Sequence, residues 1–206
     1  MNVVVIAPHP DDEAIGCGGT VCLHADRGDR VVTVFLTSGE LALPHLPKAE
    51  AWAIREGEAA EAARLLGTDA PIFLRLPDWF VGDAVGKAAV GLRPVLDLVQ
   101  PDIVYLPHRQ EWHPDHQASV AVLRAVTGGN HIPTVRAYEI WTPLQEHDWV
   151  EDIGSVIERK MCAIAAYRSQ LDHFRYDRAI RGLNEYRGIL AGRCAFAEVF
   201  ASVELT

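Results

Sequence analysis

The stretch NVVVIAP at residues 2–8 decides how the rest of the chain is organised. From Val3 onward its apolar, mostly β-branched residues run without a polar break and end at a proline. This pattern is typical of a strand buried on both faces of a parallel sheet. Residues 12–28 then carry apolar side chains at helical spacing, and a second apolar run, DRVVTVFLTSGE, covers 29–40. A strand, a helix and a strand in this order predict a β–α–β unit with 2–8 as its first, central strand.

The same alternation continues to the end of the chain. Further helices are predicted over 49–67, over 84–99, from Pro114 onward and over 153–170, and further strands over 71–77, 101–108, 134–143 and 195–205. We therefore expect an α/β fold, a three-layer α/β/α sandwich around a mostly parallel, Rossmann-like sheet. The chain of 206 residues suits one domain spanning 1–206. Ligands of such sheets bind beyond the carboxyl ends of the strands.

Composition and charge narrow the classes of partner. The formal net charge is −9, and the basic residues are scattered, so we expect no nucleic-acid partner. The N-terminus MNVVVIAPHP has no basic leader, and its apolar run is too short to cross a bilayer, so we expect a cytoplasmic protein without a membrane partner. The four cysteines form no C-x-x-C pair and are interpreted as reduced thiols.

The stretch GCGGT at 16–20 follows the first strand, where dinucleotide-binding proteins carry a glycine-rich loop. Its order does not match G-x-G-x-x-G, and no acidic residue ends the second strand at the distance a ribose requires. We therefore expect no nucleotide site. The glycines are better explained by close packing of the first helix on the sheet.

The tripeptide His-Pro-Asp occurs twice, in HPDDE at 9–13 and in HPDH at 113–116, each time after a predicted strand. Proline at the first helical position and acidic residues in the first turn are common helix starts, so each copy alone has a purely structural explanation. Two copies at the same edge of one sheet are hard to attribute to chance. A helix start also directs backbone N–H groups toward the ligand crevice, so structure and function are compatible here.

The two motifs together contain the ligands of a catalytic metal site. Two imidazoles and one carboxylate are a common set for zinc, which leaves a fourth position open for water. Three ligands can be drawn from a pool of six residues with a carboxylate to spare: His9, Asp11, Asp12, His113, Asp115 and His116. Zinc lowers the pKa of bound water to roughly 7, so the spare carboxylate can accept its proton, and a protonated histidine can stabilise the negative oxygen that forms. Fe²⁺, Co²⁺ and Mn²⁺ suit the same ligands. His108, at the end of a strand, is a candidate supporting group.

These residues, APHPDDE at 7–13 and HPDH at 113–116, resemble the motifs of the PIG-L/LmbE-like N-acetylglucosaminyl deacetylases, zinc hydrolases that remove an acetyl group from an amino sugar. Other segments are similar to family patterns as well: TSGE at 37–40, R-x-x-E at 55–58, RLPD at 75–78, K-x-x-A-x-x-x-Y-x-S-Q at 160–170 and AEVF at 197–200. The resemblance runs through most of the chain.

The resemblance implies a role for each matching residue. It implies His9, Asp12 and His116 as zinc ligands and Asp11 as the general base. It further implies His113 as the charged partner of the tetrahedral oxygen, Asp115 as a carboxylate that orients a histidine, and a sugar pocket that includes Glu40, Arg55 and Asp78. Each of these last three also has a structural explanation: Arg55 with Glu58 as a solvated helix pair, and Glu40 and Asp78 as turn caps.

One position departs from the family pattern. Some members carry a tyrosine two residues before the second motif, where this chain has Glu111, followed by Trp112. The departure bears on any role of that tyrosine in the reaction and on the choice of substrate. The segment PDWF at 77–80 suits either a substrate pocket or a contact between identical subunits, and a homo-oligomer is compatible with the sequence.

The function expected from these observations is zinc-dependent removal of an acetyl group from an N-acetylglucosamine-type moiety of a small glycoside. Two alternatives remain open. The same zinc site suits hydrolysis of a non-sugar N-acyl compound, because the metal selects the amide and not its substituents. A non-catalytic metal- or sugar-binding protein would not need a spare carboxylate, which disfavours that alternative.

Overall fold

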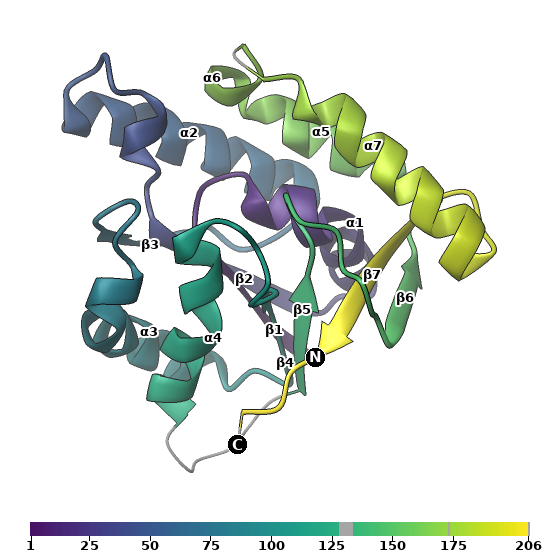
Figure 1. The fold of residues 1–206 in the computed structure, drawn as a ribbon, viewed down its shortest axis with the longest axis horizontal. Helices are drawn as coiled ribbons and strands as arrows, with labels where there is room; N and C mark the ends of the chain where they lie inside the picture. The colour runs from purple at the N-terminus through teal and green to yellow at the C-terminus, as the bar shows by residue number, and fades with distance from the viewer. Residues whose placement is uncertain (128–133, 173, 206) are drawn as a thin grey trace.

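The computed structural model describes residues 1–127, 134–172 and 174–205 and shows a seven-stranded sheet in the order β3-β2-β1-β4-β5-β7-β6 (Figure 1). The strands are β1 (Asn2–Ala7), β2 (Arg30–Thr37), β3 (Ile72–Leu76), β4 (Ile103–Pro107), β5 (Thr134–Tyr138), β6 (Trp149–Asp152) and β7 (Ala197–Ser202). β1 to β5 are parallel, and β7 runs antiparallel to β5 and to β6. The predicted α/β fold with a mostly parallel sheet is confirmed.

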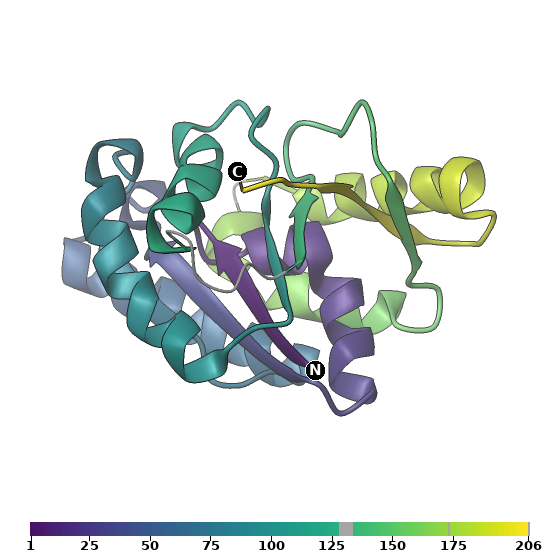
Figure 2. The same ribbon diagram turned by 90° about the horizontal axis from the view of Figure 1, so that it is seen from below.

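Helices cover both faces of this sheet, as Figures 1 and 2 show. One layer contains α1, α2 and α5, which contact one another, and the other contains α3 and α4. The helices are α1 (Asp12–Asp26), α2 (Lys48–Leu66), α3 (Val85–Val99), α4 (Pro114–Thr127), α5 (Ile157–Ala166), α6 (Arg168–Leu171) and α7 (Tyr176–Arg187), with short helical turns η1 (Glu40–Ala42), η2 (Gly82–Ala84) and η3 (Gly188–Gly192). None of the described helices is both long enough and apolar enough to cross a membrane.

The central strand β1 is buried on both faces, as its sequence predicts. Val3 and Val5 belong to the apolar core beneath α1 and α5, whereas Val4 and Ile6 belong to the core beneath α3 and α4. Because successive side chains of a strand point to opposite faces, a continuous apolar run is what a two-sided core requires. Burial of β1 therefore joins the two helical layers through one strand.

Two predicted elements differ from the structure, and two observed elements have no counterpart in the prediction. The strand expected over 134–143 ends at Tyr138, and the helix expected over 153–170 is divided into α5 and α6 around Tyr167. β6 and α7 were not predicted. β6 is a four-residue edge strand with two acidic residues, and α7 is polar with few buried side chains, so neither carries a strong apolar pattern.

The glycines after β1 permit close packing, as their sequence predicts. A Cβ atom at Gly16 would lie 2.1 Å from the ring of Tyr138, and one at Gly19 would lie 2.6 Å from Ile153. Both separations are shorter than van der Waals contact. The segment GCGGT thus brings α1 against β5 and the start of the α5 layer.

A buried ion pair supports α1 at a break in its hydrogen bonding. Cys17 has non-helical dihedral angles (φ −142°, ψ 18°), which interrupt the helix. Glu198 of β7 accepts hydrogen bonds from the backbone N–H groups of Gly19 and Thr20, both at 2.8 Å. Lys160 of α5 donates to Glu198 at 2.7 Å and to the carbonyl of Ile15 at 2.8 Å. The pair therefore serves the backbone groups that the break leaves free.

Removal of one charge from this pair should destabilise the protein strongly. For Lys160→Met we expect the free energy of unfolding to fall by about 3–5 kcal/mol, because Glu198 would remain as an uncompensated buried charge. Urea unfolding followed by circular dichroism measures the change. Arg181→Met is the matched control, since Arg181 pairs with the exposed Glu158 on the surface and its loss should have little effect. Equal stability of the two variants would contradict this account.

Candidate active site

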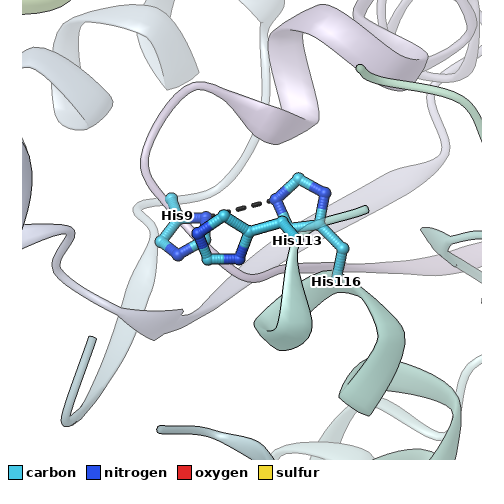
Figure 3. Close-up of side chains that lie close together, drawn as sticks. All are labelled: His9, His113 and His116. Carbon is cyan, nitrogen blue, oxygen red and sulfur yellow. Dashed lines mark hydrogen bonds between the residues drawn. The ribbon is translucent and has the colours of Figure 1, made fainter. Parts of the chain in front are cut away.

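Both His-Pro-Asp segments lie at the carboxyl edge of the sheet, where neighbouring strands β1 and β4 end. His9 follows β1, Asp12 begins α1, and His116 lies in the first turn of α4. Asp12 Oδ2 is 3.2 Å from His9 Nδ1 and 3.2 Å from His116 Nε2, and the two nitrogens are 3.3 Å apart. Figure 3 shows the imidazoles of His9 and His116 facing each other, with His113 beside them.

This triangle of donor atoms has the dimensions of a metal site. Ligands about 2.1 Å from a tetrahedral ion lie about 3.4 Å apart, close to the three distances observed. Burial acts to lower the pKa of His9, but hydrogen bonds with Asp115, Asp12 and Asp78 raise it well above its usual value. The surrounding carboxylates thus attract positive charge to the place where a cation would sit.

His9 also takes part in two other clusters of candidate ligands. Its Nε2 lies 3.2 Å from Asp78 Oδ1 and 3.2 Å from Asp115 Oδ2, and its ring is near those of His113 and His116. In each cluster one donor atom per residue lies within 4.8 Å of the others. The His9–Asp12–His116 triangle leaves Nε2 of His9 free to donate to a carboxylate, which is how metal-binding histidines are usually held. The geometry therefore favours that triangle.

Asp11 lies next to the triangle in a strained backbone conformation. Its φ is 130°, a value that non-glycine residues rarely adopt. Tyr176 donates a hydrogen bond to Asp11 Oδ2 at 3.1 Å, and Arg55 Nη2 lies 3.7 Å from Oδ1 while donating to the carbonyl of Pro10. Burial raises the pKa of Asp11 to about 6 in spite of the opposing charge of Arg55. Strain of this kind clusters at functional sites.

His113 is fixed by the backbone of its own loop. The N–H of Asp115 donates to His113 Nδ1 at 3.2 Å, so a neutral His113 carries its proton on Nε2. Burial and then the charges of His9 and His116 lower the pKa of His113 to about 4. The sequence predicts a charged His113, whereas this pKa shift runs in the opposite direction, because the ring is buried and shares its site with two other imidazoles.

Asp115 connects the second motif to the loop after β3. Its two carboxylate oxygens accept hydrogen bonds from the backbone N–H groups of Trp79 at 2.8 Å and Val81 at 3.0 Å. Trp79 has a φ of 73°, in the left-handed region. Asp115 Oδ2 is also the atom near His9 Nε2, so one carboxylate holds both a histidine and a strained loop.

Glu111, the position that departs from the family pattern, lies behind His116. Its Oε1 accepts hydrogen bonds from the backbone of Ile140 at 2.8 Å and Thr142 at 3.1 Å, and its Oε2 is 3.6 Å from His116 Nδ1. His108 Nε2 is 3.4 Å from Oε1, which places it next to Glu111 and not next to the motif. Burial acts to raise the pKa of Glu111, but these two imidazoles and the backbone donors outweigh it and hold the pKa at about 2.

Of the three residues expected to line a sugar pocket, two line a cavity and one does not. Arg55 and Asp78 line a cavity of about 560 Å³ that opens beside His9 and Asp11. The interpretation of Arg55 as a solvated pair with Glu58 is wrong, because Arg55 is 2% exposed and Glu58 instead accepts hydrogen bonds from Ser169. The carboxylate of Glu40 contacts Trp52 Nε1 at 3.1 Å and Lys48 at 2.7 Å, while its neighbours in the chain reach the cavity.

Several residues of the site have no role assigned to them from the sequence. Tyr176, which donates to Asp11, lies on the unpredicted helix α7. Tyr167 donates to Glu13 at 2.5 Å, behind the first motif. The cavity is bordered by aromatic side chains from separate loops, namely Trp79, Trp112, Trp141 and Phe174. Of these, Trp79 and Trp112 lie in segments that the sequence singles out, whereas Trp141 and Phe174 do not.

Comparison with known proteins decides the family. The sequence profile described as PIG-L, GlcNAc-PI de-N-acetylase, matches residues 4–127, which include both His-Pro-Asp motifs. The chain belongs to the PIG-L family. The chain is 31% identical over 194 residues to a probable N-acetyl-alpha-D-glucosaminyl L-malate deacetylase 2 of Bacillus cereus, and the match covers 83% of this chain and 84% of that protein.

Two further proteins resemble this chain. A 1D-myo-inositol 2-acetamido-2-deoxy-alpha-D-glucopyranoside deacetylase of Kineococcus radiotolerans is 30% identical over 188 residues, which cover 69% of this chain but 52% of that protein. The chain thus spans about half the length of that relative. The N,N'-diacetylchitobiose deacetylase of Pyrococcus horikoshii superposes with a TM-score of 0.81 at 28% identity, over 98% of this chain and 84% of that one.

The strain at Trp79 predicts an unusual order of stability. Glycine adopts a positive φ far more readily than alanine does. The free energy of unfolding of Trp79→Gly should therefore be about 1 kcal/mol larger than that of Trp79→Ala, which makes the glycine variant the more stable one. Urea unfolding of both variants measures the difference. At the exposed Val90 in α3 the order should reverse, because glycine is less favourable than alanine inside a helix. A less stable glycine variant at position 79 would show that the conformation is not strained.

Proposed function

We propose that this chain is a metal-dependent hydrolase that removes the acetyl group from an N-acetylglucosamine-type moiety of a small molecule. The observation that carries the proposal is the triangle of His9 Nδ1, Asp12 Oδ2 and His116 Nε2, with sides of 3.2 to 3.3 Å. His9 and Asp12 of this triangle, together with Asp11, line the cavity of about 560 Å³. The three relatives named above are deacetylases of N-acetylated sugars, which supports the same reaction class.

His9, Asp12 and His116 would hold the metal, with zinc as the expected ion and Fe²⁺, Co²⁺ or Mn²⁺ as alternatives for the same donors. When bound, such an ion polarises the amide carbonyl and lowers the pKa of water. Other side chains of the protein orient the two histidines. Asp115 would accept the Nε2 proton of His9, which keeps the tautomer that turns Nδ1 to the triangle. The carboxylate of Glu111 lies 3.6 Å from Nδ1 of His116 and places negative charge behind that imidazole.

Asp11 is the proposed general base. Tyr176 and Arg55 hold its two carboxylate oxygens from different sides, which fixes the direction in which Asp11 accepts a proton. In the reaction, a water molecule adds to the amide carbon, Asp11 takes one of its protons, and that proton passes to the leaving nitrogen as the C–N bond breaks. The products are acetate and a free amine.

His113 is the proposed partner of the developing negative oxygen. Because the N–H of Asp115 donates to Nδ1, the Nε2–H of a neutral His113 is available for donation, and His113 lines the cavity. A donor in place before the reaction stabilises the charge that forms on the carbonyl oxygen. This role does not require a charged imidazole.

The role of Asp11 as the base is tested by two matched variants in an assay that measures the release of acetate from an N-acetylglucosamine conjugate. Asp11→Asn should lower kcat by roughly 10²-fold to 10⁴-fold, because the amide cannot accept a proton. Asp115→Asn should cost less, because the amide oxygen can still accept one of the hydrogen bonds. Metal content is measured on both samples and should be retained in Asp11→Asn. A larger loss in Asp115→Asn would show that the two roles are assigned wrongly.

Removal of the metal should abolish activity. Protein treated with a chelator and verified as metal-free should release no acetate from N-acetylglucosamine conjugates, and one equivalent of zinc should restore the rate. Parallel additions of Fe²⁺, Co²⁺ and Mn²⁺ identify the most effective ion. Hydrolysis by the metal-free protein would refute the proposal. Faster hydrolysis of non-sugar N-acyl compounds would favour that substrate class, and metal binding without any hydrolysis would favour a binding protein.

A further inference from the structure

The cavity beside the proposed centre has an aromatic wall that the deacetylation itself does not use. Trp79 and Trp112 are 46% and 58% exposed, and their ring centroids lie 6.3 Å apart. Both also contact the ring of His113, with centroids at 4.4 Å from Trp79 and 5.3 Å from Trp112. The indoles of Trp79 and Trp112 form what we call the indole wall, and this wall packs against the imidazole of His113. The indole wall thus extends from the solvent-exposed edge of the cavity to His113.

The position of Trp79 is held at an energetic cost. Its left-handed backbone conformation depends on the hydrogen bonds that Asp115 accepts from Trp79 and Val81. A half-exposed indole makes little use of this arrangement for core packing. Its placement is explained if the ring binds something inside the cavity, since strain is retained where it serves a site.

A second aromatic cluster lies next to the proposed base. Trp141 and Tyr176 have ring centroids 5.5 Å apart, and Phe174, which is 63% exposed, lies 6.2 Å from Tyr176 and 6.3 Å from Trp141. Trp141 and Phe174 line the same cavity as the indole wall. Aromatic surface therefore borders the cavity near both His113 and Asp11.

The charge of the cavity disfavours substrates that carry a negative charge away from the amide. Its lining includes three carboxylates, those of Asp11, Asp12 and Asp78. Among the described residues that line it, Arg55 is the one guanidinium, and it is buried against Pro10 and Asp11. The nearby cations are also paired, Lys48 with Glu40 at 2.7 Å and Arg75 with Glu56 at 2.8 Å.

We infer that the substrate is an N-acetylglucosaminide with an uncharged, aromatic aglycone, the group attached to the sugar, and that the indole wall binds this aglycone. The inference rests on the proposed function and names its substrate class. Planar apolar groups stack on exposed indoles, which gives affinity without any charged contact. A carboxylate-bearing aglycone, such as the malate in the name of the Bacillus relative, would face the carboxylates of Asp11 and Asp78, and the one guanidinium of the described lining is already buried against Pro10 and Asp11.

Three matched substrates test the inference with the zinc-loaded, full-length protein: the methyl, phenyl and 4-carboxyphenyl glycosides of N-acetylglucosamine, each as both anomers. Acetate release gives kcat/KM for each. We expect the phenyl glycoside to exceed the methyl glycoside roughly tenfold, because stacking adds a contact that methyl lacks. The 4-carboxyphenyl glycoside keeps the ring and adds a charge, so its kcat/KM should fall several-fold below that of the phenyl glycoside.

The variant Trp112→Ala tests whether the indole wall causes the preference for the phenyl glycoside. Trp112 is exposed, so the variant should fold, and its unfolding midpoint verifies this. We expect its kcat/KM to fall at least fivefold more for the phenyl than for the methyl glycoside. Trp149→Ala is the control, because Trp149 is an exposed tryptophan on β6 whose ring contacts Arg136, and the phenyl-to-methyl ratio should stay unchanged.

The outcomes separate the inference from the function on which it rests. Equal rates on the methyl and phenyl glycosides, or preference for the carboxylate, would overturn the inference while the deacetylase function stands. An equal loss on all substrates in Trp112→Ala would overturn it too, because it would mean that the indole stacks on the sugar itself. If no glycoside released acetate, the proposed function would fail first.

Discussion

The pairing of β1 with β4 is the constraint on which the site depends. These strands are parallel neighbours, in register from Val3 with Ile103 to Val5 with Tyr105, although about 100 residues of chain separate them. Their carboxyl ends therefore meet at one edge of the sheet. The loop after β1 delivers His9 and the loop after β4 delivers His116, each at the start of a helix. Two helix starts of similar sequence become one cluster because the sheet brings them together.

Carboxylates that accept backbone hydrogen bonds hold this cluster in place. Asp115 binds the backbone of the loop after β3, and Glu111 binds the backbone of the segment after β5. Glu198 supports the broken helix α1, which carries Asp12 at its first position. Each of these side chains ties a loop or helix to an element far away in sequence. The donor atoms are thus oriented by the fold itself, as a site that acts without rearrangement requires.

Periodicity and local motifs were enough to predict the parallel sheet and the meeting of the two motifs. The apolar run of β1 and the prolines and glycines around each strand report burial and turns directly. The contacts of Tyr176 with Asp11 and of Glu111 near His116 could not be predicted, because they join segments with no shared pattern. The same holds for the indole wall, which is assembled from two loops, and for the pKa of His113, which depends on its neighbours.

The central claim is that His9 Nδ1, Asp12 Oδ2 and His116 Nε2 form one metal site. Anomalous X-ray diffraction at the zinc edge, from crystals of the zinc-loaded protein, tests it by locating the ion. We predict a single strong peak about 2.1 Å from each of these three atoms. A peak on the other side of His9, between its Nε2 and the carboxylates of Asp78 and Asp115, would contradict the account.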